Sequence, residues 1–355
     1  MPFASGYFRT SYERDMRLLD TRAQIASLAA FLVALAAFPL VASSFLLDLA
    51  NQFFLASIGA VALMLLTGYA GQVSLGHAGL MAAGAFTVGI LVKEAAAPFW
   101  LTIPAAALVG ALLGVVFGLP SLRLRGLYLA VSTLALHFVV IHFGAEYETK
   151  RGFSTGILIE PPSIASFELL DARIWYCVLA TAAGATVLLA LNLLRTRTGR
   201  AWRALHDHET VAEALGINVP AAKLTAFVIT STITAVAGAL FAYYRGFVSV
   251  EAFSLFLSIQ YVAMVIIGGM GSILGALLGA AFVTLFPYVV ETLIGFAPTP
   301  ERFASLVFAV NYAAFGLVMV LFLLFEPEGL VGIWRRLRDW FLLWPFRKRP
   351  LAGSR

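Results

Sequence analysis

The chain has 355 residues, of which 61% are hydrophobic and only 12% are charged. A water-soluble protein of this length could not bury so much apolar surface in one core, so the composition excludes a soluble globular protein and indicates one that lies in lipid. The net charge of +5 does not indicate nucleic acid binding, because basic residues that flank membrane spans are the ordinary signal for orientation in a membrane.

Apolar runs of about 20 residues, enough to cross ~30 Å of hydrocarbon as helix, recur along most of the chain. They follow a polar N-terminal segment, 1–24, and precede a basic tail, 331–355, so the transmembrane domain is expected over 25–330. Breakers between the runs predict helices at 25–47, 50–68, 74–92, 99–119, 126–144, 172–194, 223–245, 254–270, 273–295 and 303–325. The expected fold class is therefore all-α, a polytopic membrane protein with about ten transmembrane helices. The segments 74–92 and 254–270 are rich in glycine or polar residues, so each either spans or is re-entrant.

Basic residues indicate the orientation of these helices. With a cytoplasmic N-terminus, most of the 24 Lys and Arg residues fall in loops on the cytoplasmic side, as the positive-inside rule requires. We expect both termini to be cytoplasmic.

A polar, glycine-rich island interrupts the apolar pattern at Gly68–Phe86, which reads GYAGQVSLGHAGLMAAGAF. The island is either a turn between the second and third helices or, if the third segment is re-entrant, a lining of the solute path. Small residues let the backbone approach a solute, and isolated hydroxyls and amides can bond a polar solute without charge. The candidate pathway residues of this kind are Gln72, Ser74, His77, Ser132, Thr133, His137, Gly268, Gly269, Gly271 and Ser272. For each of them, packing between helices is the alternative role.

A short internal echo links two of the expected helices. Val109–Pro120 reads VGALLGVVFGLP and Leu274–Pro287 reads LGALLGAAFVTLFP. The two segments lie five expected spans apart and so run in opposite directions, as an inverted repeat of five plus five helices would place them. Independent helix-packing glycines explain the echo equally well.

Catalytic chemistry has no visible carrier in the sequence. No GxxxxGK[ST] loop occurs, so the chain does not hydrolyse a nucleotide through a P-loop. No HExxH, GxSxG or metal-spaced cysteine pair occurs, and His206 and His208 diverge on a helix too far to chelate one metal ion. Acidic residues fall at or beyond the expected span ends, which argues against the alternative of an ion-coupled secondary carrier. We expect a non-catalytic membrane protein with no metal site and no cofactor of its own.

The longest expected cytoplasmic loop, 195–222, has the pattern of an amphipathic helix. Trp202, Leu205, Ala212 and Leu215 recur at three- and four-residue steps, and Gly216 would stop the helix. Such a helix either lies on the lipid surface or inserts its apolar face into a groove on a partner. Its acidic residues disfavour an anionic leaflet and favour the partner.

This loop also carries a resemblance to a known family. Gly199–Tyr243, which begins GRAWRALHDHETVAEALG, resembles the cytoplasmic coupling loop and following helix of branched-chain amino acid ABC importer permeases of the LivM type. The island at Gly68–Phe86 and the segments Leu122–Ala135, Val248–Ala280 and Phe325–Leu330 are similar to other blocks of that family, in its order. The resemblance covers most of the chain from Gly68 to Leu330.

The resemblance implies a permease of the bacterial inner membrane that pairs with a LivH-type permease, two cytoplasmic ATPases that bind ATP and Mg²⁺, and a periplasmic binding protein. It implies import of branched-chain or other neutral amino acids, with urea, amides or aromatic acids as alternative substrates of the same superfamily. Glu213, Ala214 and Gly216 match the family's element that seats a coupling helix in the ATPase. With the apolar stripe, the expected ATPase-coupling residues are Gly199, Arg200, Trp202, Leu205, Glu209, Ala212, Glu213, Ala214, Leu215 and Gly216.

Two departures from the family pattern concern the partners. The external loop after the fifth span, Glu148–Ile164, lacks the usual TGG turn and NGI sequence, so docking of the binding protein is expected to differ in detail. His206, Asp207 and His208 replace Arg-Asp-Asn-like residues, which changes the charge offered to the ATPase and suggests a particular cognate ATPase.

Overall fold

The computed structural model describes residues 22–124, 126–153, 156–164, 167–168, 171–295, 307–326 and 328–343. Most of the expected N-terminal segment and the end of the expected tail lie outside these ranges. Within them the long helices are α2 (Arg22–Val41), α3 (Ser44–Leu63), α4 (His77–Ala95), α5 (Phe99–Gly118), α6 (Leu127–Arg151), α7 (Ala172–Leu193), α10 (Val219–Arg245), α11 (Leu255–Gly268), α12 (Ile273–Gly295), α14 (Val307–Phe325) and α15 (Gly329–Leu343). Shorter elements are the π-helix η1 (Met64–Tyr69), the 3₁₀ turns η2 (Pro120–Leu122) and η3 (Val250–Phe253), the helices α8 (Arg197–Asp207) and α9 (Glu209–Ala214), and the strands β1 (Ile157–Leu158), β2 (Ser163–Ile164), β3 (Phe167–Glu168) and β4 (Phe247–Val248).

The expectation of an all-α polytopic membrane protein is confirmed. In the described ranges, eight helical segments are long and apolar enough to cross a membrane, or nine if the bent pair Ala309–Phe325 and Gly329–Trp340 is one span. The count of ten was therefore approximate. The two segments whose spanning was left open, 74–92 and 254–270, each overlap such a helical segment, His77–Ala95 and Val250–Gly268.

The main differences from the expected helices lie at the two ends of the domain. The expected helix 25–47 is interrupted, because α2 ends at Val41 and Ser43 caps a new helix by accepting from Leu46 N at 3.4 Å. At the other end, the expected tail begins within α15, whose Val331 is buried and whose Gly329 contacts Gly269. This first part of the tail is a helix packed on the transmembrane bundle.

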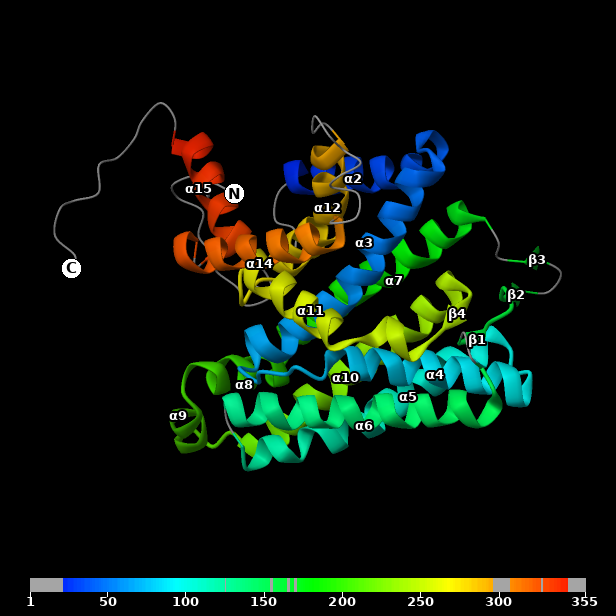
Figure 1. Cartoon of the computed structure of the whole chain (residues 1–355). Helices are drawn as coiled ribbons and strands as arrows, with labels where there is room; N and C mark the ends of the chain where they lie inside the picture. The colour runs from blue at the N-terminus through cyan, green and yellow to red at the C-terminus, as the bar shows by residue number, and fades with distance from the viewer. Residues whose placement is uncertain are drawn as a thin grey trace.

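Helix α4 packs against both α5 and α6, and α10 packs against α4 and α5 (Figure 1). Glycines allow the close contact between α4 and α10. A Cβ atom on Gly84 would lie 1.9 Å from the carbonyl oxygen of Ala235, and one on Gly238 would lie 1.9 Å from that of Met81. Neither position can hold a side chain unless the backbones separate, so these glycines set the distance between the two helices.

The two ends of the bundle differ in their short elements (Figure 1). We call the end with α8 and α9 the loop end, and the end with the four short strands the strand end. At the strand end β1 pairs antiparallel with β4, with Ile157 opposite Val248, which joins the segment after α6 to the segment after α10.

The two echoed segments lie on α5, which runs toward the loop end, and α12, which runs away from it. Gly110 and Gly114 of α5 contact α10, whereas Gly275 and Gly279 of α12 contact α11. The opposite directions agree with an inverted repeat, and the close glycine contacts agree with the packing alternative. The repeat stays a prediction.

Candidate functional site

The loop segment between α7 and α10 folds as two short helices where the sequence predicted one. Thr196 caps α8 by accepting from Gly199 N at 3.4 Å, and Asn218 caps α10 by accepting from Ala221 N at 3.1 Å. His208 is extended, with φ −155°, and separates α8 from α9. The loop segment is thus an ordered helical unit.

Most of the predicted apolar stripe faces this chain itself. Trp202, Leu205 and Ala212 are each no more than 5% exposed, and Trp202 Nε1 donates to the carbonyl oxygen of Ala222 at 3.0 Å. The expectation that the whole stripe meets a partner or lipid was therefore wrong for these three residues, because the stripe packs on the start of α10. Leu215 (74% exposed) and Val211 (53% exposed) are the large apolar side chains that the segment leaves accessible.

The remaining predicted coupling residues divide in the same way. Gly199 is buried, and a Cβ atom there would lie only 2.4 Å from Leu194 Cα. The Glu209 side chain is 19% exposed. The exposed members are Arg200, Glu213, Ala214 and Gly216. Gly216 has φ +82° with open space around its Cβ position, so the backbone there requires glycine and a partner has room to approach. The functional roles of these residues stay predictions.

Lys223 is the residue of this region that the sequence analysis missed. Its side chain is 2% exposed, and Nζ lies 2.6 Å from Glu209 Oε1 and 3.2 Å from the carbonyl oxygen of Ser121. The pair therefore joins α9, the start of α10 and the turn after α5. A lysine fourteen residues from its acidic partner, in a loop already rich in basic residues, gives no sequence signal for this contact.

Residues 70–76 of the polar island connect η1 to α4 as a non-helical segment. Its peptide groups are held by hydroxyls of other helices: Leu75 N donates to Thr133 Oγ1 at 3.0 Å, and Ala78 N donates to Ser258 Oγ at 2.9 Å. The His77 ring lies 4.7 Å from the Tyr261 ring. Of the predicted pathway residues, Gln72, Ser74, His77, Thr133, His137, Gly268 and Gly269 are buried, Ser132 and Ser272 are half-buried, and Gly271 is exposed.

Two breaks in the helices meet at the loop end, and the first of them contacts α8. The Cβ position of Gly68, at the end of α3–η1, lies 2.8 Å from Gly271 N, which is in the break between α11 and α12. The Cβ position of Gly71 lies 3.2 Å from His206 Cα. The Arg203 guanidinium lies 5.6 Å from the centre of the Tyr69 ring. A displacement of α8 would thus act directly on the island and reach the second break only through Gly68.

A cleft of about 330 Å³ lies on the other side of the island, toward the strand end. Helices α3, α4, α10, α11 and α12 contribute to its walls, and its polar lining consists of Gln52, Arg245, Gln260, Tyr261, Thr284, Tyr288 and Glu291. None of the ten predicted pathway residues lines this cleft. The amides Gln52 and Gln260, which lie at helical positions among apolar residues, were the available signal in the sequence.

No three His, Cys, Asp or Glu side chains gather as a metal site in the ranges that the structure describes. The described residues thus form a loop segment packed on α10, two helix breaks that contact each other, of which one contacts α8, and a cleft near the opposite end.

Residues 45–323 match the family described as the permease component of the branched-chain amino acid transport system. The chain belongs to this permease family. The permease is 30% identical to the high-affinity branched-chain amino acid transport system permease protein LivM of Salmonella typhimurium, over 87% of this chain and 75% of the relative. It is also 30% identical to LivM of Escherichia coli K12, with the same coverage of each chain.

Other relatives match parts of the permease. It is 28% identical to LivH of Escherichia coli K12 over 47% of this chain and 49% of the relative. It is 29% identical to the autoinducer 2 import system permease protein LsrC of an Enterobacter species, over 50% of this chain and 51% of the relative. No solved structure matches the chain.

Proposed function

We propose that the permease is the membrane subunit of an ATP-driven importer for branched-chain or other neutral amino acids. The observation that carries this proposal is the similarity to LivM proteins, which extends over 87% of the chain. The proposal includes a location in the bacterial inner membrane with both termini in the cytoplasm, so that the loop end faces the cytoplasm, in agreement with the distribution of basic residues.

The proposed partners are a homologous LivH-type permease, two cytoplasmic ATPases and a periplasmic binding protein. The absence of a P-loop from the sequence supports ATP and Mg²⁺ binding on other chains. The exposed surface of α8 and α9, with Arg200, Glu213 and Leu215, supports docking of an ATPase at the loop end.

In the proposed mechanism, ATP binding closes the ATPase dimer and carries α8 and α9 with it. The Lys223–Glu209 pair transmits this displacement to α10. The contact of His206 with Gly71 transmits it to the island, and Gly68 transmits it to the break at Gly271. The helices then alternate between inward-open and outward-open states, and the loop segment acts by displacement and not by chemistry.

The test is uptake by proteoliposomes that contain the permease with its candidate partners. We expect uptake of radiolabelled leucine that requires ATP and the binding protein, and none when the ATPase carries a substitution in its P-loop lysine. Alanine, phenylalanine and urea in parallel samples identify the substrate class. Uptake that survives loss of the ATPase and collapses with the proton gradient would instead identify a secondary carrier, and uptake of urea alone would identify an amide importer.

A further inference from the structure

The cleft at the strand end combines apolar walls with two opposite charges. Met81, Leu257, Met264 and Val283 give it apolar surface from four different helices. Arg245, the last residue of α10, and Glu291, near the end of α12, contribute a cation and an anion from separate helices. Pockets of this size that combine apolar walls with a few polar groups are the usual form of small-molecule sites.

The guanidinium of Arg245 is held at the cleft by aromatic rings. It lies 5.9 Å from the centre of the Phe241 ring and 5.8 Å from that of the Tyr244 ring. Both contacts restrict the long side chain before any ligand arrives, which lowers the entropy cost of binding. In the part of the chain that the structure describes, neither the Arg245 guanidinium nor the Glu291 carboxylate forms an ion pair or a hydrogen bond, so each charge is available to a ligand.

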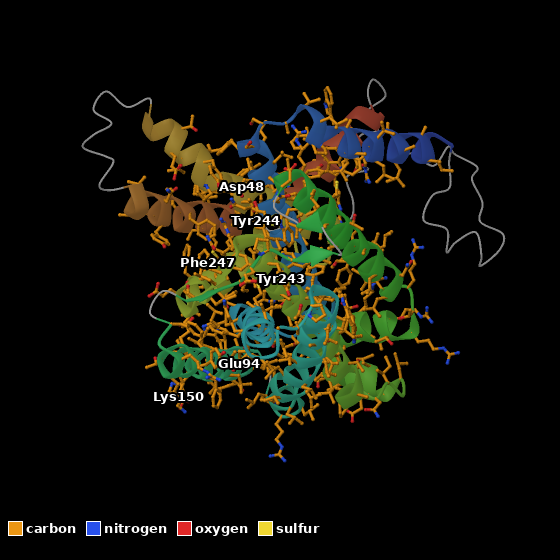
Figure 2. The ribbon with its side chains drawn as sticks, turned by 90° about the vertical axis from the view of Figure 1, so that its right-hand side faces the viewer. Asp48, Glu94, Lys150, Tyr243, Tyr244 and Phe247 are labelled. Carbon is orange, nitrogen blue, oxygen red and sulfur yellow. The ribbon has the colours of Figure 1, made fainter. Side chains whose placement is uncertain are left out.

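The neighbouring carboxylate is already in use. Asp48 accepts a hydrogen bond from Tyr244 and another from Gln52 Nε2 at 2.6 Å. Asp48 and Tyr244 lie next to each other in Figure 2. Gln52 Nε2 also lies 3.2 Å from Tyr288 Oη, so this network fixes one wall of the cleft. The Glu291 carboxylate is therefore the acid that the cleft offers to a ligand.

We propose that this cleft binds the transported amino acid as a zwitterion, with Arg245 at its carboxylate and Glu291 at its ammonium group. The apolar side chain of the solute lies against Met81, Leu257 and Met264. This inference rests on the proposed function and adds to it a solute site within the permease itself. One cation and one anion across an apolar cleft match a neutral amino acid better than an uncharged amide or a simple anion, each of which would leave one charge without a counterpart.

Tyr261 links the cleft to the polar island, so a solute site here could respond to movement of the loop end. Tyr261 lines the cleft, and its ring lies 4.7 Å from the ring of His77, the first residue of α4. The part of the polar island that precedes His77 contacts α8 at Gly71. The bound solute therefore rests next to the segment that the loop helix contacts.

The experiment uses the assembled complex in proteoliposomes without nucleotide. Cys177 is replaced by Ser, and Ala252→Cys, at the edge of the cleft, reports occupancy through its rate of labelling with a maleimide. Three solutes compete: leucine, leucinamide, which lacks the carboxylate, and 4-methylpentanoate, which lacks the ammonium group. Val73→Cys at the loop end controls for effects on labelling in general.

We expect leucine to protect Ala252→Cys at concentrations about tenfold or more below either analogue, since a hydrogen bond to a charged group contributes at least that factor. Arg245→Gln should abolish only the preference for leucine over leucinamide. Glu291→Gln should abolish only the preference for leucine over 4-methylpentanoate. Arg173→Gln and Glu160→Gln make the same charge changes in exposed residues outside the cleft and should keep both preferences.

Equal protection by all three solutes, no protection by leucine at tens of millimolar, or unchanged preferences in Arg245→Gln and Glu291→Gln would each overturn the assignment. The outcome is separate from that of the uptake test, because labelling needs no ATP. ATP-driven uptake without protection would support the proposed function and contradict the solute site. Protection without ATP-driven uptake would support a solute site in the cleft and contradict the proposed function.

Discussion

Lys223 and Glu209 form an ion pair with 2.6 Å between Nζ and Oε1, and their side chains are only 2% and 19% exposed. The pair joins the loop helix α9 to the transmembrane helix α10, and the second bond of Lys223, to the carbonyl oxygen of Ser121, adds the turn after α5. A charge removed from water in this way is stabilised by its counter-charge, so each member depends on the other.

Replacing one member of this pair should therefore destabilise the permease. We expect Lys223→Met to cost about 3–5 kcal/mol, because it leaves the Glu209 carboxylate buried beside an apolar side chain. The double variant Lys223→Met/Glu209→Leu should recover most of the loss. Thermal unfolding of the purified protein in detergent measures both. The exposed pair of Lys150 with Glu146, 2.8 Å apart, is the control, and Lys150→Met should change stability by less than about 1 kcal/mol. Equal effects at Lys223 and Lys150 would contradict the interpretation.

Gly71 should be sensitive to substitution through its neighbour as well as its backbone. Its φ is +66° and a Cβ would lie 3.2 Å from His206 Cα, so Gly71→Ala strains the chain and presses on α8. Gly152 has φ +72° with no atom within 4 Å of its Cβ position, so Gly152→Ala adds backbone strain of about 1–2 kcal/mol and no steric contact. We expect Gly71→Ala to reduce ATP-driven uptake and Gly152→Ala to leave it near the wild-type rate. If both variants reduced uptake equally, backbone strain would explain the loss and the contact of Gly71 with His206 would not be needed for transport.

Leu215 and Trp202 should separate binding of the ATPase from folding of the loop segment. Leu215 is 74% exposed, so Leu215→Glu should weaken copurification of the ATPase while the melting temperature stays unchanged. Trp202 is fully buried and donates to Ala222, so Trp202→Ala should cost about 3–5 kcal/mol and lower the melting temperature. Copurification of the ATPase with Leu215→Glu at the wild-type level would place the docking surface elsewhere.

Cysteine labelling should report whether the island moves during transport. Ser74 is 2% exposed and its neighbour Val73 is 36% exposed. With Cys177 replaced by Ser, Val73→Cys should react with a maleimide much faster than Ser74→Cys in the absence of nucleotide. During ATP turnover, the labelling of Ser74→Cys should accelerate, because displacement of α8 opens the island. A rate at Ser74→Cys that ATP leaves unchanged would show that the island stays closed.

The positions of most membrane helices could be predicted from the sequence. The requirement that a spanning backbone satisfy its own hydrogen bonds makes each apolar run a helix, which is why eight expected helices, from 50–68 to 273–295, correspond to candidate spans. The prediction of one helix over 25–47 was wrong, because Ser43 caps a new helix there. The mean hydropathy of an apolar run does not reveal such a cap.

The candidate sites were only partly predictable. The amphipathic stripe of the loop was visible in the sequence, but its burial depends on α10, which supplies the carbonyl oxygen of Ala222 to Trp202. The Lys223–Glu209 pair and the cleft with Arg245 and Glu291 bring together residues that are distant along the chain. Hydropathy carries no information about such pairings.

The sequence by itself determined that this protein lies in a membrane, where its helices fall and which family it resembles, because these properties depend on local composition and on contiguous motifs. The tertiary structure alone decided which face of the loop segment is buried, which helix breaks meet and where the cleft lies. Those features depend on how close two backbones can approach, and glycines such as Gly84 and Gly238 set that distance only once their partner helices are in place.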